Sequence, residues 1–331
     1  MMNEKYDITM IYLNGLLRDS GGYADINDGE ANLRAYLSVL KTFKELGQKP
    51  SVGLAAGNNQ TSAGINFIRS CHHANGGFSP NPGSDPAAYD TAVGLICLSN
   101  LGEKLENNSG LLAGYLPASL KFISQNAVTQ FDHFMHVAVY EECGLPGPIP
   151  GTTISFFQQQ LHNSIKSKRI LDTAIASASL LRAGMQVEDS REVIDLLISG
   201  QNTGDGGFGE DGVSSLFITY CVLRTLVLLK VLPNIRRLET YLDSLRTRFG
   251  FTDMIGGKTS AGATYMNISL RNWIKQLQAV PVSAAMTGDV EYLKKWLANG
   301  GNPNQYDDQG WTVLLAAASR GRSDVVDMLL N

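Results

Sequence analysis

The segment 132–136, Asp-His-Phe-Met-His, holds the densest group of metal-ligating side chains in the sequence. Residues three or four positions apart share one face of a helix, so Asp132 and His136, or His133 and His136, would lie together. Carboxylate and imidazole groups are zinc ligands, although a further ligand would have to come from elsewhere in the chain. The sequence thus offers Asp132, His133 and His136 as a candidate zinc site. The alternative is that Asp132 caps the helix and the histidines are partly exposed.

Carboxylates also gather in the glycine-rich turns, where Asp85, Asp90 and Asp211 are candidate catalytic residues. If these turns meet at one end of the fold, two carboxylates there would act as general acid and base, or hold a divalent ion. The alternative is that acidic residues occupy the first turns of helices because they interact favourably with the helix dipole. Spacing alone leaves both interpretations open.

Two other motifs carry weaker indications. Cys71 precedes two histidines, but a catalytic thiolate needs a histidine beside it in space, and imidazoles also suit the end of a helix. Residues 256–259, Gly-Gly-Lys-Thr, imitate the end of a phosphate-binding loop. The required first glycine is Thr252, and no strand precedes it, so we reject an ATP site.

Composition excludes several classes of protein. The 331 residues are 44% hydrophobic and 18% charged, with a net charge of −4, which argues against nucleic-acid binding. The four cysteines are scattered, as expected in a reducing compartment. Arg224 and Lys230 interrupt the most apolar run, so we expect no membrane span. The N-terminus has no basic start followed by an apolar stretch, which predicts a cytoplasmic protein, with export to a host cell by another route as an alternative.

Repeated turns between helical segments must position the candidate residues. Gly-Gly-aromatic triplets at 21–23, 76–78 and 206–208 each lie between two apolar segments with helical spacing. Degenerate copies of the turn occur at Gln130-Phe131 and at residues 249–251. The pattern predicts an all-α fold of six helical hairpins. The predicted pairs are 6–18 with 30–46, 58–72 with 86–101, 112–126 with 129–143, 152–165 with 168–183, 190–199 with 213–231, and 234–248 with 262–276.

The second helices of two hairpins also resemble each other. Residues 89–92, Tyr-Asp-Thr-Ala, match residues 171–174, Leu-Asp-Thr-Ala. A Gly-Gly-Phe turn followed by an apolar helix with Asp-Thr resembles the repeat of the prenyltransferase β-subunit and squalene/terpene cyclase superfamily. The resemblance covers about residues 1–275. It implies an (α/α)6 toroid over 1–276, with six inner and six outer helices around a cavity that often holds an isoprenoid.

The resemblance implies that inner-helix aromatic residues are candidates for the cavity wall. Because large aromatic side chains usually pack in cores, we expect most of them to lie between helices. The aromatic residues on the expected inner helices are Tyr36, Phe43, Tyr89, Phe134, Phe217, Tyr220 and Tyr265.

The chemistry of the superfamily is less well matched than its repeat. Its protein prenyltransferases bind zinc through Asp-x-Cys and a distant histidine, whereas this sequence contains no Asp-x-Cys. Its proton-donating cyclases use an Asp-x-Asp-Asp box, of which only Asp90 and the following Thr91-Ala92 remain. The cyclases are also rich in tryptophan, which is absent from residues 1–272.

The end of the chain has a different repeat. Ala284-Ala285-x-x-Gly288 recurs as Ala317-Ala318-x-x-Gly321, at the 33-residue period of ankyrin repeats. Residues 310–317 resemble the Gly-x-Thr-Pro-Leu-His-x-Ala ankyrin box. With all three tryptophans at or beyond position 273, this predicts a second domain over 277–331. About three ankyrin repeats are normally needed for stability, so we expect a truncated array, and the resemblance implies a protein partner.

Two functions follow from these features. The first is a toroid-plus-ankyrin interaction protein, similar in domain combination to bacterial effectors, whose toroid lacks the usual catalytic motifs. The second is a metal-dependent or acid–base enzyme of the same superfamily, acting in the toroid cavity on an isoprenoid or another apolar molecule. Loss of the catalytic motifs favours the first, and the 132–136 segment favours the second.

Overall fold

The computed structural model describes residues 2–48, 59–101, 111–187, 190–298, 301–304, 306–307 and 309–330. Residue 58 of the second predicted hairpin, and residues 1 and 331 of the predicted domains, lie outside these ranges. Helices dominate the described residues, as the all-α prediction requires. The elements are α1 (Met2–Gly15), α2 (Leu33–Glu45), α3 (Asn59–Ser70), α4 (Ala88–Asn100), α5 (Leu111–Asn126), α6 (Gln130–Glu142), α7 (Gly151–Lys166), α8 (Ile170–Arg182), α9 (Ser190–Ser199), β1 (Gly209–Glu210), β2 (Val213–Ser214), α10 (Leu216–Leu229), α11 (Ile235–Ser244), α12 (Ala261–Thr287), α13 (Val290–Ala298), α14 (Val313–Ser319) and α15 (Ser323–Leu330).

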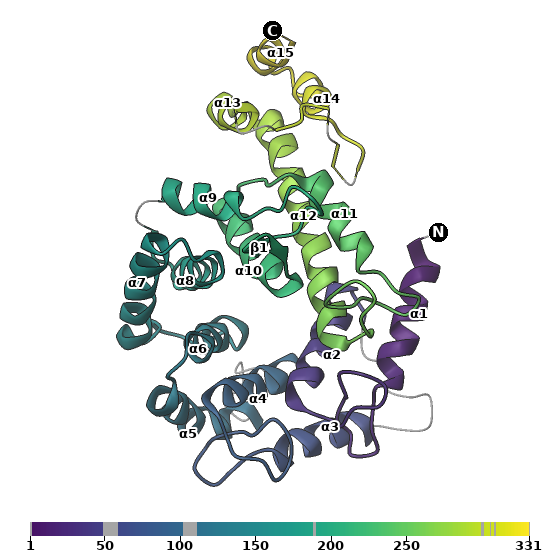
Figure 1. Ribbon diagram of the computed structural model, residues 1–331, viewed down its shortest axis with the longest axis vertical. Coiled ribbons are helices and arrows are strands. Elements are labelled where there is room, and N and C mark those ends of the chain that lie inside the picture. The colour runs from purple at the N-terminus through teal and green to yellow at the C-terminus, as the bar shows by residue number, and fades with distance from the viewer. Residues whose placement is uncertain are drawn as a thin grey trace.

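Helices α1 to α12 form the predicted toroid. The even-numbered helices make an inner ring in which each packs against the next, and α12 closes the ring against α2 (Figure 1). The odd-numbered helices lie outside them. Asn272 on α12 donates a hydrogen bond of 2.7 Å to the carboxylate of Glu45 on α2. At the opposite end of this seam, Gly262 donates its backbone N–H to Asp25 at 2.9 Å.

In four of the hairpins a glycine–aromatic turn connects the outer helix to the inner one. Gly76 has φ +89°, and a Cβ there would lie 2.7 Å from the backbone oxygen of Ala118, so a larger residue would clash. The following Phe78 is fully buried, and its N–H donates to the hydroxyl of Thr91 at 2.9 Å. This contact gives a physical reason for the Thr of the Asp-Thr pattern: it fixes the turn to the first turn of the inner helix.

The same threonine contact recurs in other hairpins. Thr219 accepts a bond from the N–H of Phe208 at 2.9 Å, and Thr264 accepts one from the N–H of Phe251 at 3.2 Å. The third hairpin lacks the glycines, and there Thr129 and Asp132 form a capping box at the start of α6 instead.

Helix α12 differs from its predicted length. It continues through Pro281 to Thr287 without a break, so the predicted boundary between residues 276 and 277 falls inside a helix. Trp273 packs in the toroid core, whereas Val282 and Ala285 of the same helix pack with Leu293 and Val313 in the ankyrin core. The tryptophan at 273 therefore belongs to the toroid, and the division at 276/277 stays a prediction.

Across the described residues, no helix is both long and apolar enough to cross a membrane.

Candidate functional site

The inner helices surround a central cavity of about 590 Å³. All six of them contribute to its lining, including Arg182 at the end of α8. The volume lies within the usual range for small-molecule sites, about 300 to 1,000 Å³. The central cavity is thus the candidate functional site of the toroid.

The cavity wall is largely aromatic. Five of the seven aromatic residues that the sequence places on inner helices line it, so the expectation that most of the seven lie between helices is wrong. Only Tyr36 and Phe43 fit that expectation, at 4% and 0% exposure. The structure adds Trp273, which lies in the predicted toroid but was not among the aromatic candidates for the cavity wall. The aromatic lining residues are Tyr89, Phe134, Phe217, Tyr220, Tyr265 and Trp273.

Three of these rings are organised around one another. The hydroxyls of Tyr220 and Tyr265 are 3.0 Å apart, and the rings of Tyr220 and Trp273 have centroids 4.8 Å apart. Burial is the main cause that raises the pKa of Tyr220 well above its usual value, so its hydroxyl stays neutral. The group presents a hydroxyl pair within an otherwise apolar wall.

Charged side chains form one end of the cavity. Arg182 and Arg224 share the carboxylate of Glu141, with Nε of Arg182 2.6 Å and Nη2 of Arg224 3.1 Å from its oxygens. Nζ of Lys41 lies 2.6 Å from Oε1 of Glu142, and Nζ of Lys44 lies 4.0 Å from Oε2 of the same residue. Two cations therefore share one carboxylate in each case. We call these four cations and two acids the cationic end.

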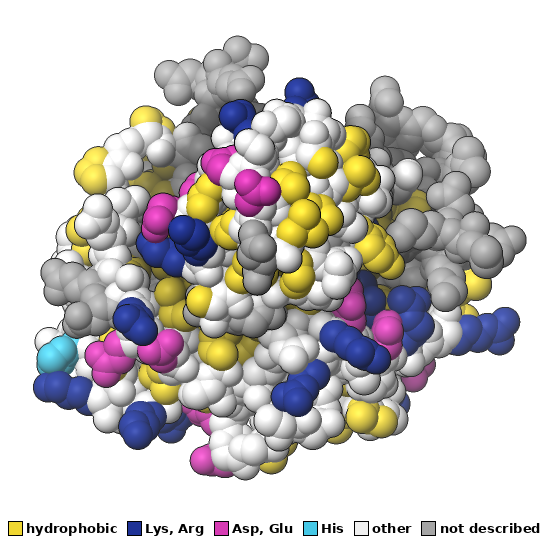
Figure 2. Space-filling view, turned by 90° about the horizontal axis from the view of Figure 1, so that it is seen from above, with side chains coloured by type: hydrophobic (Ala, Val, Ile, Leu, Met, Phe, Trp, Pro, Cys, Tyr) yellow, Lys and Arg dark blue, Asp and Glu magenta, His cyan; other side chains and the backbone are white. Residues whose placement is uncertain are grey.

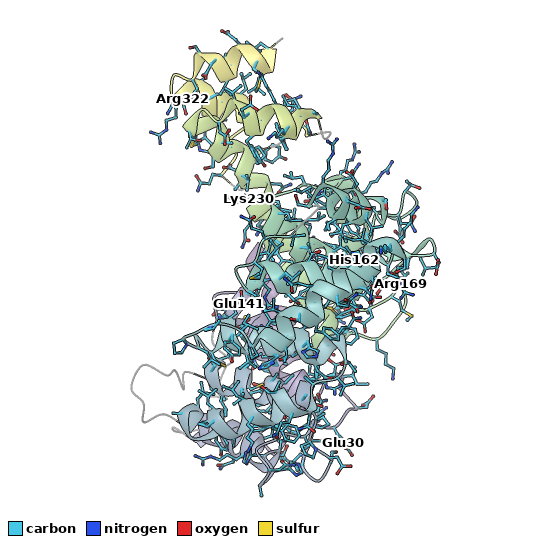
Figure 3. The ribbon with its side chains drawn as sticks, turned by 90° about the vertical axis from the view of Figure 1, so that its left-hand side faces the viewer. Glu30, Glu141, His162, Arg169, Lys230 and Arg322 are labelled. Carbon is cyan, nitrogen blue, oxygen red and sulfur yellow. The ribbon has the colours of Figure 1, made fainter. Side chains whose placement is uncertain are left out.

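The cationic end lies where the inner helices finish. Figure 3 shows Glu141, in the last turn of α6, and Lys230, directly after α10, on one side of the toroid. Glu30 and Arg169, just before α2 and α8, lie on the other side. Burial alone would lower the pKa of Lys41, but Tyr265 and Glu142 raise it, and the lysine stays charged. Burial likewise raises the pKa of Glu142, but Lys41 more than offsets this, and the net shift is downward.

The same cations also contact the aromatic wall. The guanidinium of Arg182 lies 5.2 Å from the ring centre of Phe134, and that of Arg224 lies 5.2 Å from the ring centre of Trp273. These distances are within the range of cation–π attraction. The contacts hold the cations against the wall and join the apolar and charged parts of the cavity.

The predicted acid Asp90 is a structural ion-pair partner. Its side chain is 1% exposed, and its two oxygens accept from Nε and Nη2 of Arg34 at 2.7 and 2.8 Å. Both oxygens of this carboxylate are engaged by the bidentate guanidinium and are not presented to a substrate. Asp90 also does not line the cavity, although Tyr89 beside it does.

The other two predicted acids do not converge with it. Asp85 and Asp211 are exposed, and neither lines the central cavity. Asp211 has φ +54° and lies in the turn between β1 and β2. Among the residues that line the cavity, the carboxylates are Glu45 and Glu142, both with hydrogen-bond partners at the ends of the helices. The predicted general acid–base pair is therefore not assembled by these three residues.

The candidate zinc ligands have other partners. The carboxylate of Asp132 accepts from the backbone N–H of Thr129 at 2.8 Å, as the capping alternative expected. Nδ1 of His133 and Nδ1 of His136 both lie beside the hydroxyl of Thr153, at 3.3 and 3.2 Å. No group of three or more His, Cys, Asp or Glu side chains suited to a metal occurs in the described ranges. These three residues thus do not form a ligand set with one another.

The cysteine motif has no nucleophile. The thiol of Cys71 is fully buried, and burial is the main cause that raises its pKa to about 12. His72 packs its ring against Phe78 and Tyr115, at 4.8 and 4.7 Å between ring centres. Both residues support the core near the second turn.

Two family models match the chain. The prenyltransferase alpha-alpha toroid domain matches residues 4–137 and 153–305, and the ankyrin repeats (many copies) model matches residues 282–330. The chain belongs to the prenyltransferase α/α toroid domain family. The two matches overlap in the region where α12 continues from the toroid into the ankyrin segment.

Solved structures show the same fold. A variant of the type II terpene cyclase MstE from Scytonema, without ligand, matches at 12% identity and TM-score 0.53, covering 83% of this chain and 96% of that one. Another MstE variant, in complex with geranylgeranyl dihydroxybenzoate as substrate, matches at 13% identity and TM-score 0.48, covering 83% and 97%. A protein from Actinoplanes matches at 13% identity and TM-score 0.49, covering 84% and 99%. A comparison with curated protein sequences finds no match.

The sequence analysis missed the cationic end. Its residues come from α2, α6, α8 and α10, and the paired groups are 41 to 101 positions apart in the chain. One signal was present in the sequence: Arg224 interrupts the most apolar run of the chain. A charged residue there requires a partner or water, and Glu141 is that partner.

Proposed function

We propose that the toroid binds an elongated apolar molecule with an anionic head group, and that the ankyrin segment recruits a protein partner. The observation that carries the first part is the sharing of one carboxylate by two cations, twice, at one end of an aromatic cavity. Each group contains two cations and one carboxylate, so each keeps one unit of positive charge in excess. An anionic head group placed there would balance this excess, while the hydrocarbon would lie along the aromatic wall.

A binding role accounts for the cavity better than acid-initiated catalysis. Proton donation to an alkene needs a protonated carboxyl group that faces the substrate. Glu45 accepts a hydrogen bond from Asn272 at 2.7 Å, and Glu142 has a pKa lowered by Lys41 despite its burial. Neither carboxylate is poised as a proton donor. The type II cyclases with this fold, whose names state a terpene substrate, make an isoprenoid a reasonable hydrocarbon class.

The partner-binding role rests on the ankyrin repeats, which in other proteins typically bind protein partners. Figure 2 looks onto this end of the molecule and shows hydrophobic side chains exposed over it, with Lys and Arg side chains around it. Leu315 is 51% exposed and Tyr306 is 66% exposed. Exposed apolar residues of this size are common at protein interfaces. The proposed role in protein interaction, including a role like that of bacterial effectors, depends on the combination of the toroid with ankyrin repeats.

Calorimetric titration with farnesyl diphosphate and with farnesol tests the cavity. The two probes share the hydrocarbon and differ in the anionic head, so the diphosphate is expected to bind more tightly. The variant Arg224→Met keeps the aliphatic contact with Trp273 and leaves Glu141 paired with Arg182. It should weaken diphosphate binding about tenfold or more and change farnesol binding little.

The matched control is Arg237→Met, the same substitution at an exposed position of α11. It should leave both affinities unchanged. Binding of neither probe, or equal weakening of both probes by Arg224→Met, would overturn the assignment of the cationic end to a head group.

A further inference from the structure

A second concavity lies between the toroid and the ankyrin segment. It has a volume of about 1,670 Å³ and is lined by α9, the segment from α10 to α11, one face of α12, α13 and residues 301, 302, 304, 306 and 307. Along α12 the lining positions are Ile268, Arg271, Ile274, Lys275 and Gln278, which share one helical face. We call it the junction groove. Figure 1 shows α12 passing from the ring to the ankyrin helices, and Figure 3 labels Lys230 at this level.

The groove is larger than a metabolite needs. Sites for small molecules usually enclose about 300 to 1,000 Å³. The volume of the junction groove exceeds this range, and both the toroid and the ankyrin segment contribute to its lining. Its dimensions suit a segment of polypeptide.

The charges of the groove are opposite in sign to the charge of the whole chain. Six Lys or Arg side chains line it against two Asp or Glu, although the chain carries a net charge of −4. Arg271 is paired with Asp243 at 2.7 Å. Among the described residues, the other five lining cations form no ion pair and are exposed; they are Lys230, Arg236, Arg246, Lys275 and Lys295.

Two buried polar groups in the groove wall also have no partner. Trp296 is 5% exposed, and its indole Nε1 lacks a hydrogen-bond partner within the described part of the chain. The hydroxyl of Tyr292, one turn away on α13, also has no hydrogen-bond partner among the described residues. Burial is the main cause that raises the pKa of Tyr292 to about 12, so it stays a neutral donor. Both atoms are enclosed by protein, so their unpaired state is a cost to the fold and not a contact offered to a ligand.

Apolar groups complete the surface. Ile198, Leu232, Ile274 and Phe251 line the groove beside the cations. A nucleic acid would need a basic surface for its phosphates but no apolar floor of aliphatic side chains. Cations and apolar groups together match a peptide with acidic and apolar side chains.

We propose that the junction groove binds an acidic, apolar-rich peptide segment of a protein partner. Carboxylates of the peptide contact Lys275 on α12 and Lys295 on α13, and its apolar side chains pack on the apolar lining of the groove. The proposal rests on the partner-binding part of the proposed function and is independent of the cavity ligand. It places the partner on both the ankyrin segment and the toroid.

Fluorescence anisotropy with the full chain tests the proposal. The probe is a fluorescein-labelled pool of decapeptides that alternate Asp or Glu with Leu, Ile, Val or Phe, with a pool in which Lys replaces the acids as a reference. The acidic pool should bind and the basic pool should not. The double variant Lys275→Glu/Lys295→Glu should weaken binding at least tenfold at low salt, and added salt should weaken wild-type binding.

Lys294→Glu is the matched control, because Lys294 is an exposed neighbour of Lys295 that does not line the groove. It should leave peptide binding unchanged.

Three outcomes would overturn the proposal: no binding of the acidic pool, binding unaffected by the double variant, or tighter binding of a labelled single-stranded DNA of ten nucleotides. Arg224→Met in the cavity should leave peptide binding unchanged. If the peptide fails to bind while farnesyl diphosphate still does, the groove assignment fails and the cavity assignment stands.

Discussion

The central cavity and the junction groove both contain cations and apolar groups, but their charges are organised in different ways. In and around the cavity, Lys41, Arg34, Arg182 and Arg224 each contact a carboxylate of another inner helix. In the groove, Lys230, Arg236, Lys275 and Lys295 have no carboxylate partner among the described residues. Paired charges fix helices and shape a site in advance, whereas exposed unpaired charges attract a partner from solution.

The difference follows from burial. A charge inside the ring cannot remain without a partner, because removing it from water is costly. The exposed groove cations keep their hydration, so the fold does not require them to be paired. Charge in the ring is therefore held in place by pairing before a ligand binds, whereas charge in the groove is free to pair with a partner.

Replacing one arginine by alanine in each region should give the largest difference in the free energy of unfolding. Arg34→Ala leaves the 1% exposed Asp90 carboxylate without its partner and should lower the free energy of unfolding by about 2 to 3 kcal/mol. The loss is smaller than for a wholly buried pair because the Arg34 side chain is 56% exposed. Arg236→Ala, at an exposed position in the groove, should change it by less than about 0.5 kcal/mol.

Urea unfolding of the two variants beside the wild type measures this contrast. Equal losses for Arg34→Ala and Arg236→Ala would mean that the groove cations also hold the fold together. That result would remove the distinction between the two regions.

Acidification tests the ring at a site without a carboxylate partner. Burial is the main cause that lowers the pKa of His136 from 6.5 to about 4, with a smaller contribution from His133. A histidine with a lowered pKa in the folded state resists protonation, so its contribution is complete above pH 6.5 and is lost as the pH falls from 6.5 towards 4. The loss should be about 3 kcal/mol.

His136→Gln should reduce this pH dependence, measured as the urea midpoint from pH 7 to pH 4. His162→Gln is the control, since His162 is exposed on α7 (Figure 3). An unchanged profile for His136→Gln would place the acid sensitivity elsewhere in the ring.

A smaller contrast separates two tyrosine hydroxyls. The hydroxyl of Tyr220 in the cavity bonds that of Tyr265, so Tyr220→Phe should cost about 1 kcal/mol. The hydroxyl of Tyr292 in the groove has no partner among the described residues, so Tyr292→Phe should leave the free energy of unfolding unchanged or raise it slightly. Thermal melts of both variants measure the effect. A larger loss for Tyr292→Phe would reveal a bond that stabilises the unliganded groove.

The repeat made the fold predictable to a large extent. Glycine at Gly76 and Gly206 is required by a positive φ and a close backbone approach, and such local requirements are visible in sequence. The hairpins predicted from these turns and from helical spacing match the helices of the toroid. The length of α12 was not predictable in this way, because the change of repeat suggested a boundary at 276/277, where packing on two cores maintains a helix.

The site was predictable only in its aromatic part. Inner helices face the cavity, so Tyr89, Phe134 and Phe217 could be placed near it from the pattern. The cationic end depends on pairs such as Lys41 with Glu142, which meet only when the ring closes. Local spacing instead drew attention to the segment 132–136, whose side chains serve a helix cap and a shared contact with Thr153.

The most direct test of the account is a reciprocal binding measurement on three proteins: wild type, Arg224→Met and Lys275→Glu/Lys295→Glu. Each is titrated with farnesyl diphosphate and with the acidic peptide pool. The account predicts that Arg224→Met loses about tenfold or more in diphosphate affinity alone, and that the double variant loses at least tenfold in peptide affinity alone. Loss of both ligands in either variant, or of neither ligand in both variants, would contradict two separate sites with different arrangements of charge.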